Sequence, residues 1–154
     1  MSSISPLKIY PSEDFSLFDR ALFVAVQAHS GQKDKAGNPY ILHPIAVSNF
    51  LDTEEEKAVA LLHDVLEDNP NWDAKDIKIN FGNTITEAVI LLTHKKGTKY
   101  LDYLAALKNN PLALKVKLAD IKHNSSEERL KNLPYRDQQY LSNKYKSAME
   151  FLTS

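Results

Sequence analysis

Cysteine is absent from this 154-residue chain, which excludes disulfides, thiolate zinc sites and cysteine nucleophiles together. Any metal must therefore be held by histidine and carboxylate side chains. No apolar run approaches the ~20 residues that span a bilayer, and the N-terminus lacks a basic region followed by an apolar one. We expect a cytoplasmic protein that makes no contact with a membrane. The net charge of −1 and the lack of a basic helix face argue against a nucleic-acid partner.

Glycine is scarce, with four residues in the chain, and alternating runs of β-branched residues are few. Both features favour helices over strands. Apolar spacing predicts helices over residues 15–29, 45–51, 54–67, 73–79, 84–93, 99–108, 111–122 and 135–152, with a loop over 31–39. No linker or repeat interrupts this pattern. The sequence therefore predicts a single all-α domain over residues 1–154, with its core in about 12–152.

Four charged or titratable residues stand in the otherwise apolar segment Leu61–Asp68. His63 and Asp64 are adjacent, and Glu67 and Asp68 follow at i+4, which would place the two pairs on one face of a continuous helix. Charged groups are costly to bury unless they are paired or bound to a metal. The run therefore indicates a metal site with acidic residues beside it.

Two further positions complete a candidate metal cage with His63 and Asp64, namely His43 before a proline and Asp120 in an apolar stripe. Two imidazoles and two carboxylates suit Mn, Fe or Zn better than Mg or Ca, which prefer oxygen ligands. A metal held in this way activates water for attack on phosphorus, and a nearby carboxylate can take the proton. Alone, each residue has a plainer interpretation, and a His-Asp dipeptide has about a one-in-ten chance of marking a metal site. His123 on its own is better interpreted as a core histidine bonded to backbone.

Four segments of the chain, in order and together spanning about two-thirds of it, resemble the HD-domain hydrolases of the RelA/SpoT-homologue group, especially the stand-alone small alarmone hydrolases. The segments are Ala28–Gln32, Gly37–Val47, Ala60–Asp68 and Val116–Asn124. By this resemblance the metal ligands are His43, His63, Asp64 and Asp120. Glu67 and Asp68 become the catalytic acidic pair, and Asn124 contacts the ribose of the substrate.

The resemblance also implies a reaction and a cofactor. The family removes pyrophosphate from the 3′ position of guanosine tetra- or pentaphosphate, leaving GDP or GTP. One divalent metal is expected, namely Mn²⁺, with Zn²⁺ or Fe²⁺ as alternatives, and the partner is a small-molecule nucleotide. No synthetase domain fits in the remaining residues.

One departure from the family pattern concerns the nucleobase. Family members carry an Arg-Lys pair where this chain has Asp34 and Lys35, which reverses one charge and removes a planar cation that could stack on a base. Lys35 remains a candidate for contact with substrate phosphate. A basic cluster contributes three further candidates, Lys95, Lys96 and Lys99, which would either meet the polyphosphate or form a solvated turn.

Two alternative functions stay open at this point. A hydrolase of the same fold could act on an adenine alarmone, on NADPH as a 2′-phosphate donor or on another nucleotide, and the acidic residue at position 34 favours it. A non-catalytic nucleotide sensor is the second alternative, although it would be expected to have lost some of the expected ligands or carboxylates.

Overall fold

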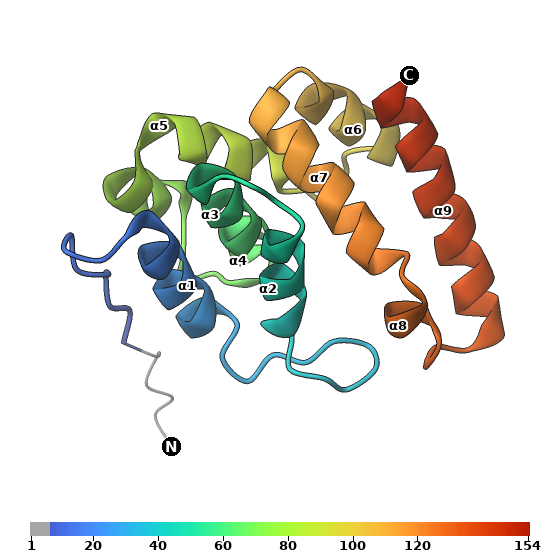
Figure 1. Ribbon diagram of the computed structural model, residues 1–154, viewed down its shortest axis with the longest axis horizontal. Helices are drawn as coiled ribbons and strands as arrows, with labels where there is room; N and C mark the ends of the chain where they lie inside the picture. The colour runs from blue at the N-terminus through green and yellow to red at the C-terminus, as the bar shows by residue number, and fades with distance from the viewer. Residues whose placement is uncertain (1–6) are drawn as a thin grey trace.

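The computed structural model describes residues 7–154, and within that range the chain forms nine helices and no strand (Figure 1). The helices are α1 (Leu17–Ala28), α2 (Leu42–Asn49), α3 (Glu54–Leu62), α4 (Val65–Asp68), α5 (Ala74–Leu92), α6 (Tyr100–Lys108), α7 (Pro111–Asn124), α8 (Glu127–Leu130) and α9 (Tyr135–Thr153). The predicted all-α class is confirmed. In the same range, no helix is long and apolar enough to cross a membrane.

Helix α3 forms the centre of the bundle, with α1, α2, α5 and α7 packed around it (Figure 1). The side chains from Ala58 to Leu62 are fully buried, and burial of each leucine contributes about 1.5–3 kcal/mol. The helix begins with a capping box, in which Thr53 accepts from the amide of Glu56 and the Glu56 carboxylate accepts from the amide of Thr53. A buried and capped α3 gives a fixed platform for the residues at its C-terminal end.

The segment after α3 departs from the sequence prediction. A continuous helix over 54–67 was expected, but α3 ends at Leu62 and α4 starts at Val65. Between them, Asp64 has φ −106° and ψ 1°, which is the sparsely allowed bridge region of the backbone. The prediction that Glu67 and Asp68 share one helix face with His63 and Asp64 is therefore wrong.

Other boundaries shift by a few residues. Helix α1 is capped by Ser16, whose hydroxyl accepts from the amide of Asp19, and α2 begins at Leu42, before the proline that was expected to open it. Gly82 separates two helical segments as predicted, because its φ of 83° kinks α5. The short helix α8 was not predicted, and it lies close to the end of α7 (Figure 1).

The described N-terminal segment lies against the start of α5. Asp76 is buried and accepts hydrogen bonds from Lys8 Nζ at 2.9 Å and from the hydroxyl of Tyr10 at 2.5 Å. The ammonium of Lys8 also lies 5.5 Å from the ring centroid of Trp72. These contacts attach residues 8–10 to the bundle.

Candidate metal centre and adjoining cavities

Three sequence-distant side chains meet in the interior at the ends of different helices. His43 comes from α2, His63 follows α3, and Asp120 lies near the end of α7, and all three are buried. Asp120 Oδ1 lies 2.8 Å from His43 Nε2 and 3.3 Å from His63 Nε2. One donor atom from each residue falls within 4.8 Å of the other two, so the three form a compact cluster that could hold a metal ion.

The fourth expected ligand, Asp64, borders this cluster through His63. Its Oδ2 atom lies 3.2 Å from His63 Nε2 and accepts a hydrogen bond from the hydroxyl of Tyr40. Burial by itself would raise the pKa of Asp64, but the neighbouring His63 outweighs it, and the pKa is lowered. The Asp64 side chain is therefore an anion held beside the three-residue cluster.

The chemistry of His63 fits a bound cation. Its Nδ1 lies 2.5 Å from the carbonyl oxygen of Ala60, which can only accept, so Nδ1 carries the proton of the neutral ring and Nε2 presents a lone pair. Within residues 7–154 this buried Nε2 has no hydrogen-bond partner, although carboxylate oxygens of Asp64 and Asp120 lie close. Burial lowers the pKa of His63, but the two carboxylates raise it well above its usual value, so with no ion bound Nε2 attracts a proton, which a metal ion would replace.

His123 belongs to the centre, contrary to the interpretation of it as a histidine bonded to backbone. Its Nδ1 lies 2.7 Å from His43 Nδ1. Burial and then the charge of His43 lower the pKa of His123 to about 4, so it is a neutral ring whose Nδ1 can accept a hydrogen bond from His43 Nδ1. This contact leaves His43 Nε2 directed at Asp120.

Lys117 is a second residue that the sequence analysis missed. Its buried ammonium donates to Asp120 Oδ2 at 3.0 Å and lies 5.2 Å from the ring centroid of Tyr103. Burial lowers the pKa of Lys117, but the charge of Asp120 raises it well above the usual value. The i, i+3 spacing of lysine and aspartate on a helix was the available signal.

Glu67 lies at the rim of the cluster and Asp68 ends α4. Glu67 Oε1 accepts from the backbone amide of His94 at 2.7 Å. Desolvation raises the pKa of Glu67, and the His94 amide partly opposes this rise. The side chain of Asp68 lies outside the described part of the chain.

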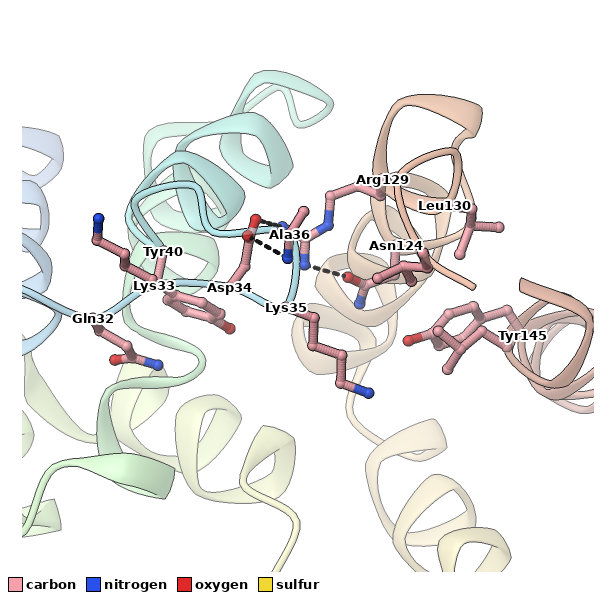
Figure 2. Close-up of a pocket in the computed structure, with 12 residues that line it drawn as sticks. Gln32, Lys33, Asp34, Lys35, Ala36, Tyr40, Asn124, Arg129, Leu130 and Tyr145 are labelled. Atoms are coloured by element: carbon pink, nitrogen blue, oxygen red, sulfur yellow. Dashed lines mark hydrogen bonds and ion pairs between the residues drawn. The ribbon is translucent and has the colours of Figure 1, made fainter. Parts of the chain in front are cut away.

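One cavity opens over the cluster and a second lies next to it, and the two share Tyr40, Asn124 and Tyr145 as walls. The first, which we call the inner cavity, has a volume of about 180 Å³, and its walls include His43, Asp64, Glu67, Tyr100, Lys117, Asp120 and Lys144. The second, the outer cavity, has a volume of about 270 Å³ and is also lined by Asp34, Lys35, Arg129, Leu130, Leu133 and Leu141 (Figure 2). The polar inner cavity beside the candidate metal ligands therefore adjoins a larger outer cavity that is partly apolar.

The expected substrate-binding residues divide into two groups. Lys35 lines the outer cavity, and Asn124 lines both cavities, where its Nδ2 donates to Asp120 Oδ1 at 3.1 Å. Lys95, Lys96 and Lys99 are exposed and line neither cavity.

Asp34, the residue that departs from the family pattern, accepts hydrogen bonds from amides of its own loop and forms an ion pair with Arg129, which also lines the outer cavity. Its Oδ1 accepts from the amides of Ala36 at 3.0 Å and Asn38 at 2.9 Å. Its Oδ2 accepts from Arg129 Nη1 at 3.2 Å, while Nη2 of that arginine donates to Asn124 Oδ1 at 3.2 Å (Figure 2). The charge of Asp34 is therefore paired, and a guanidinium still lines the cavity.

Comparison with known proteins agrees with this site. A family model described as an HD domain matches residues 21–133. The bifunctional (p)ppGpp synthase/hydrolase RelA of Mycobacterium tuberculosis is 35% identical over 130 residues, which cover 76% of this chain and 18% of RelA. The bifunctional (p)ppGpp synthase/hydrolase SpoT of Escherichia coli K12 is 32% identical over 129 residues, covering 74% of this chain and 18% of SpoT. The chain thus spans less than a fifth of the length of these relatives.

A solved structure gives the same result for the fold. It is described as a metazoan orthologue of SpoT that hydrolyses ppGpp, and it matches with a TM-score of 0.72 at 25% identity, over 94% of this chain and 88% of that chain. The resemblance inferred from the four sequence segments is confirmed. The chain belongs to the HD domain family, and RelA and SpoT are among its relatives.

Proposed function

We propose that this domain is a metal-dependent pyrophosphohydrolase that converts guanosine 3′,5′-bis(diphosphate) and water to GDP and pyrophosphate, or the pentaphosphate to GTP. The observation that carries the proposal is the buried cluster of His43, His63 and Asp120, which opens into a cavity with Glu67 at its rim. A relative in Escherichia coli O157:H7, named guanosine-3′,5′-bis(diphosphate) 3′-pyrophosphohydrolase, is 32% identical over 129 residues and supports the choice of substrate.

The metal is held by His43, His63 and Asp120, with Asp64 as the fourth ligand. Two neutral imidazoles and two carboxylates fit Mn²⁺, with Zn²⁺ and Fe²⁺ as alternatives. When bound, such an ion supplies Lewis-acid activation of water and neutralises charge on phosphate oxygens. Lys117 orients Asp120 by donating to its Oδ2 atom, and the hydroxyl of Tyr40 orients Asp64 by donating to its Oδ2 atom.

Glu67 carries the proton transfer in this proposal, with Asp68 as its acidic neighbour. The oxygen of water forms a bond to the phosphorus on the 3′ oxygen, and the bond between that phosphorus and the 3′ oxygen breaks. Glu67 accepts the proton that the water loses and returns it to the 3′ oxygen, so the nucleotide keeps a 3′-hydroxyl and pyrophosphate leaves. A raised carboxyl pKa suits a group that must both accept and release a proton. Lys35 and Asn124 contact the nucleotide.

Pyrophosphate release tests the proposal directly. Purified protein with Mn²⁺ and guanosine 3′,5′-bis(diphosphate) should form GDP and pyrophosphate, and EDTA should stop the reaction. Glu67→Gln should lower kcat by about 10²–10⁴-fold, because the amide cannot accept the proton, while metal content measured by elemental analysis stays intact. Absence of turnover at micromolar wild-type enzyme, with full metal occupancy, would refute the proposed function.

A phosphohydrolase of another nucleotide is the second candidate, and Asp34 is the observation that favours it. This residue replaces the arginine expected from the family, and Arg129 reaches the outer cavity from the other side. A panel containing adenine alarmones, NADPH and common nucleoside triphosphates, at equal concentrations, separates the two candidates. Faster turnover of any of these than of the guanosine alarmone would favour the second.

A further inference from the structure

Lys144 is a cation in the inner cavity that lacks an acidic partner. It lies on α9, where its side chain is half-buried, and its Nζ atom is 4.6 Å from the ring centroid of Tyr100 and 6.0 Å from that of Tyr145. No carboxylate of the described residues lies within ion-pair distance of it. Within the described residues, the ammonium lies against two aromatic rings instead.

Two other lysines act on Lys144 from the two cavities. Lys117 lies in the inner cavity and is already bonded to Asp120, and Lys35 reaches the outer cavity from the loop before α2 (Figure 2). Burial, then Lys117, then Lys35 lower the pKa of Lys144, and the charge of Asp120 partly opposes them. Lys144 lines the inner cavity next to Tyr145, which lines both cavities, so it lies near their junction.

Lys117 is neutralised by Asp120, whereas Lys144 and Lys35 form no ion pair with a carboxylate of the described residues. A bound anion would supply the negative partner that these two lysines lack. The metal cluster and Lys117 serve the inner end, where the reacting phosphate must lie. Lys35 lies outside the inner cavity, so an anion that contacts both Lys35 and Lys144 is placed toward the outer cavity.

We propose that Lys144 and Lys35 form an anion subsite at the junction of the two cavities, which binds a phosphate group of the substrate other than the one that is hydrolysed. This inference rests on the proposed function and narrows its substrate class to nucleotides that are phosphorylated at two positions. For guanosine 3′,5′-bis(diphosphate), the occupant is the 5′-diphosphate.

Binding of GDP in EDTA tests the subsite without turnover, because GDP carries the 5′-diphosphate and has no 3′ phosphate. Lys144→Met keeps the length of the side chain and removes its charge, so the Kd for GDP measured by calorimetry should rise about ten-fold or more. Lys144→Arg should retain most of the affinity. Lys146→Met is the matched control, since Lys146 is exposed on the same helix and lines neither cavity, and its Kd should equal that of wild type.

A comparison of two substrates, one with and one without a 5′-diphosphate, shows which phosphate group Lys144 contacts. The ratio of kcat/KM for guanosine 3′,5′-bis(diphosphate) to that for guanosine 3′-diphosphate should fall about ten-fold in Lys144→Met, because only the first substrate has a 5′ group. An unchanged ratio, or a Kd for GDP equal to that of wild type, overturns the subsite. If wild type hydrolyses neither substrate but binds GDP through Lys144, the proposed function fails and the subsite stands.

Discussion

Replacing Lys117 with methionine would remove the buried ammonium that faces Asp120 and leave a side chain of similar length. The two charged groups are 3.0 Å apart, and their side chains are 11% and 6% exposed. At an effective dielectric constant of about 20, a pair at this separation attracts by about 5 kcal/mol. Because removal of one partner also leaves the other charge buried, the net loss of unfolding free energy is expected to be about 3–5 kcal/mol.

The loss of unfolding free energy in Lys117→Met should be larger without a bound divalent ion than with one. Without a divalent ion, Asp120 keeps only the two histidines and Asn124 as partners, so the full penalty applies. With an ion in the cluster, a second cation offsets the carboxylate, and the penalty shrinks. For a chain of this size 1 kcal/mol corresponds to about 2–4 °C in Tm, so Lys117→Met should lower Tm by about 10 °C in EDTA.

Thermal unfolding in EDTA and in saturating Mn²⁺ measures both values, and Lys115→Met serves as the control. Lys115 lies on the same helix but is half-exposed in a surface pair, so its loss should be small in either condition. An equal drop for Lys117→Met with and without Mn²⁺ would show that the ion does not bind at Asp120. No drop in EDTA would refute the assignment of a buried ion pair.

Three further predictions follow from single contacts. His123→Phe should weaken Mn²⁺ binding about 10–100-fold in a metal titration, because the Nδ1 atom that orients His43 is lost, and unchanged affinity would contradict this role. Arg129→Ala frees the charge of Asp34 in the outer cavity, so KM for anionic nucleotides should rise more than kcat falls; a pure kcat effect would count against it. Burial raises the pKa of Asp76, but hydrogen bonds from the N-terminal segment outweigh it and lower the pKa below 3.8. The stability that this carboxylate contributes is therefore complete above about pH 4 and is lost as pH falls through the folded pKa, and urea unfolding of Asp76→Asn should show a weaker acid dependence there.

The metal cluster could be anticipated because its residue types are uncommon inside apolar segments. His43, His63 and Asp120 stood in three such segments, and the structure brings them together. What the periodicity could not show was the break after α3, since the backbone at Asp64 departs from helical values while the apolar pattern continues through Val65. The position of Glu67 relative to the cluster could therefore not be predicted from the sequence and became clear only from the folded structure.

Lys117 and His123 were missed for a different reason. Each is a polar residue of α7 whose helical neighbours are partly apolar, and each contacts a residue far away in sequence. The histidine reaches a residue 80 positions earlier, and the lysine faces rings of α6. The burial of these two side chains leaves no local sequence signal, although the i, i+3 spacing of Lys117 and Asp120 indicated their pairing. The outer cavity is equally non-local, because the loop before α2 and the helices α8 and α9 build its walls (Figure 2).

Asp120 joins the candidate metal centre to the cavities proposed to bind the nucleotide. Its Oδ1 lies near the Nε2 atoms of His43 and His63, which can each bind a proton or a metal ion. In contrast, Asn124 donates to Oδ1 and Lys117 donates to Oδ2 through groups that bind no cation. An incoming metal therefore replaces protons and leaves two of the carboxylate's contacts in place, so the ligand is oriented before the ion arrives. Because Asn124 also lines both cavities, a nucleotide that contacts its amide acts on the same carboxylate, and substrate binding and metal affinity should be coupled.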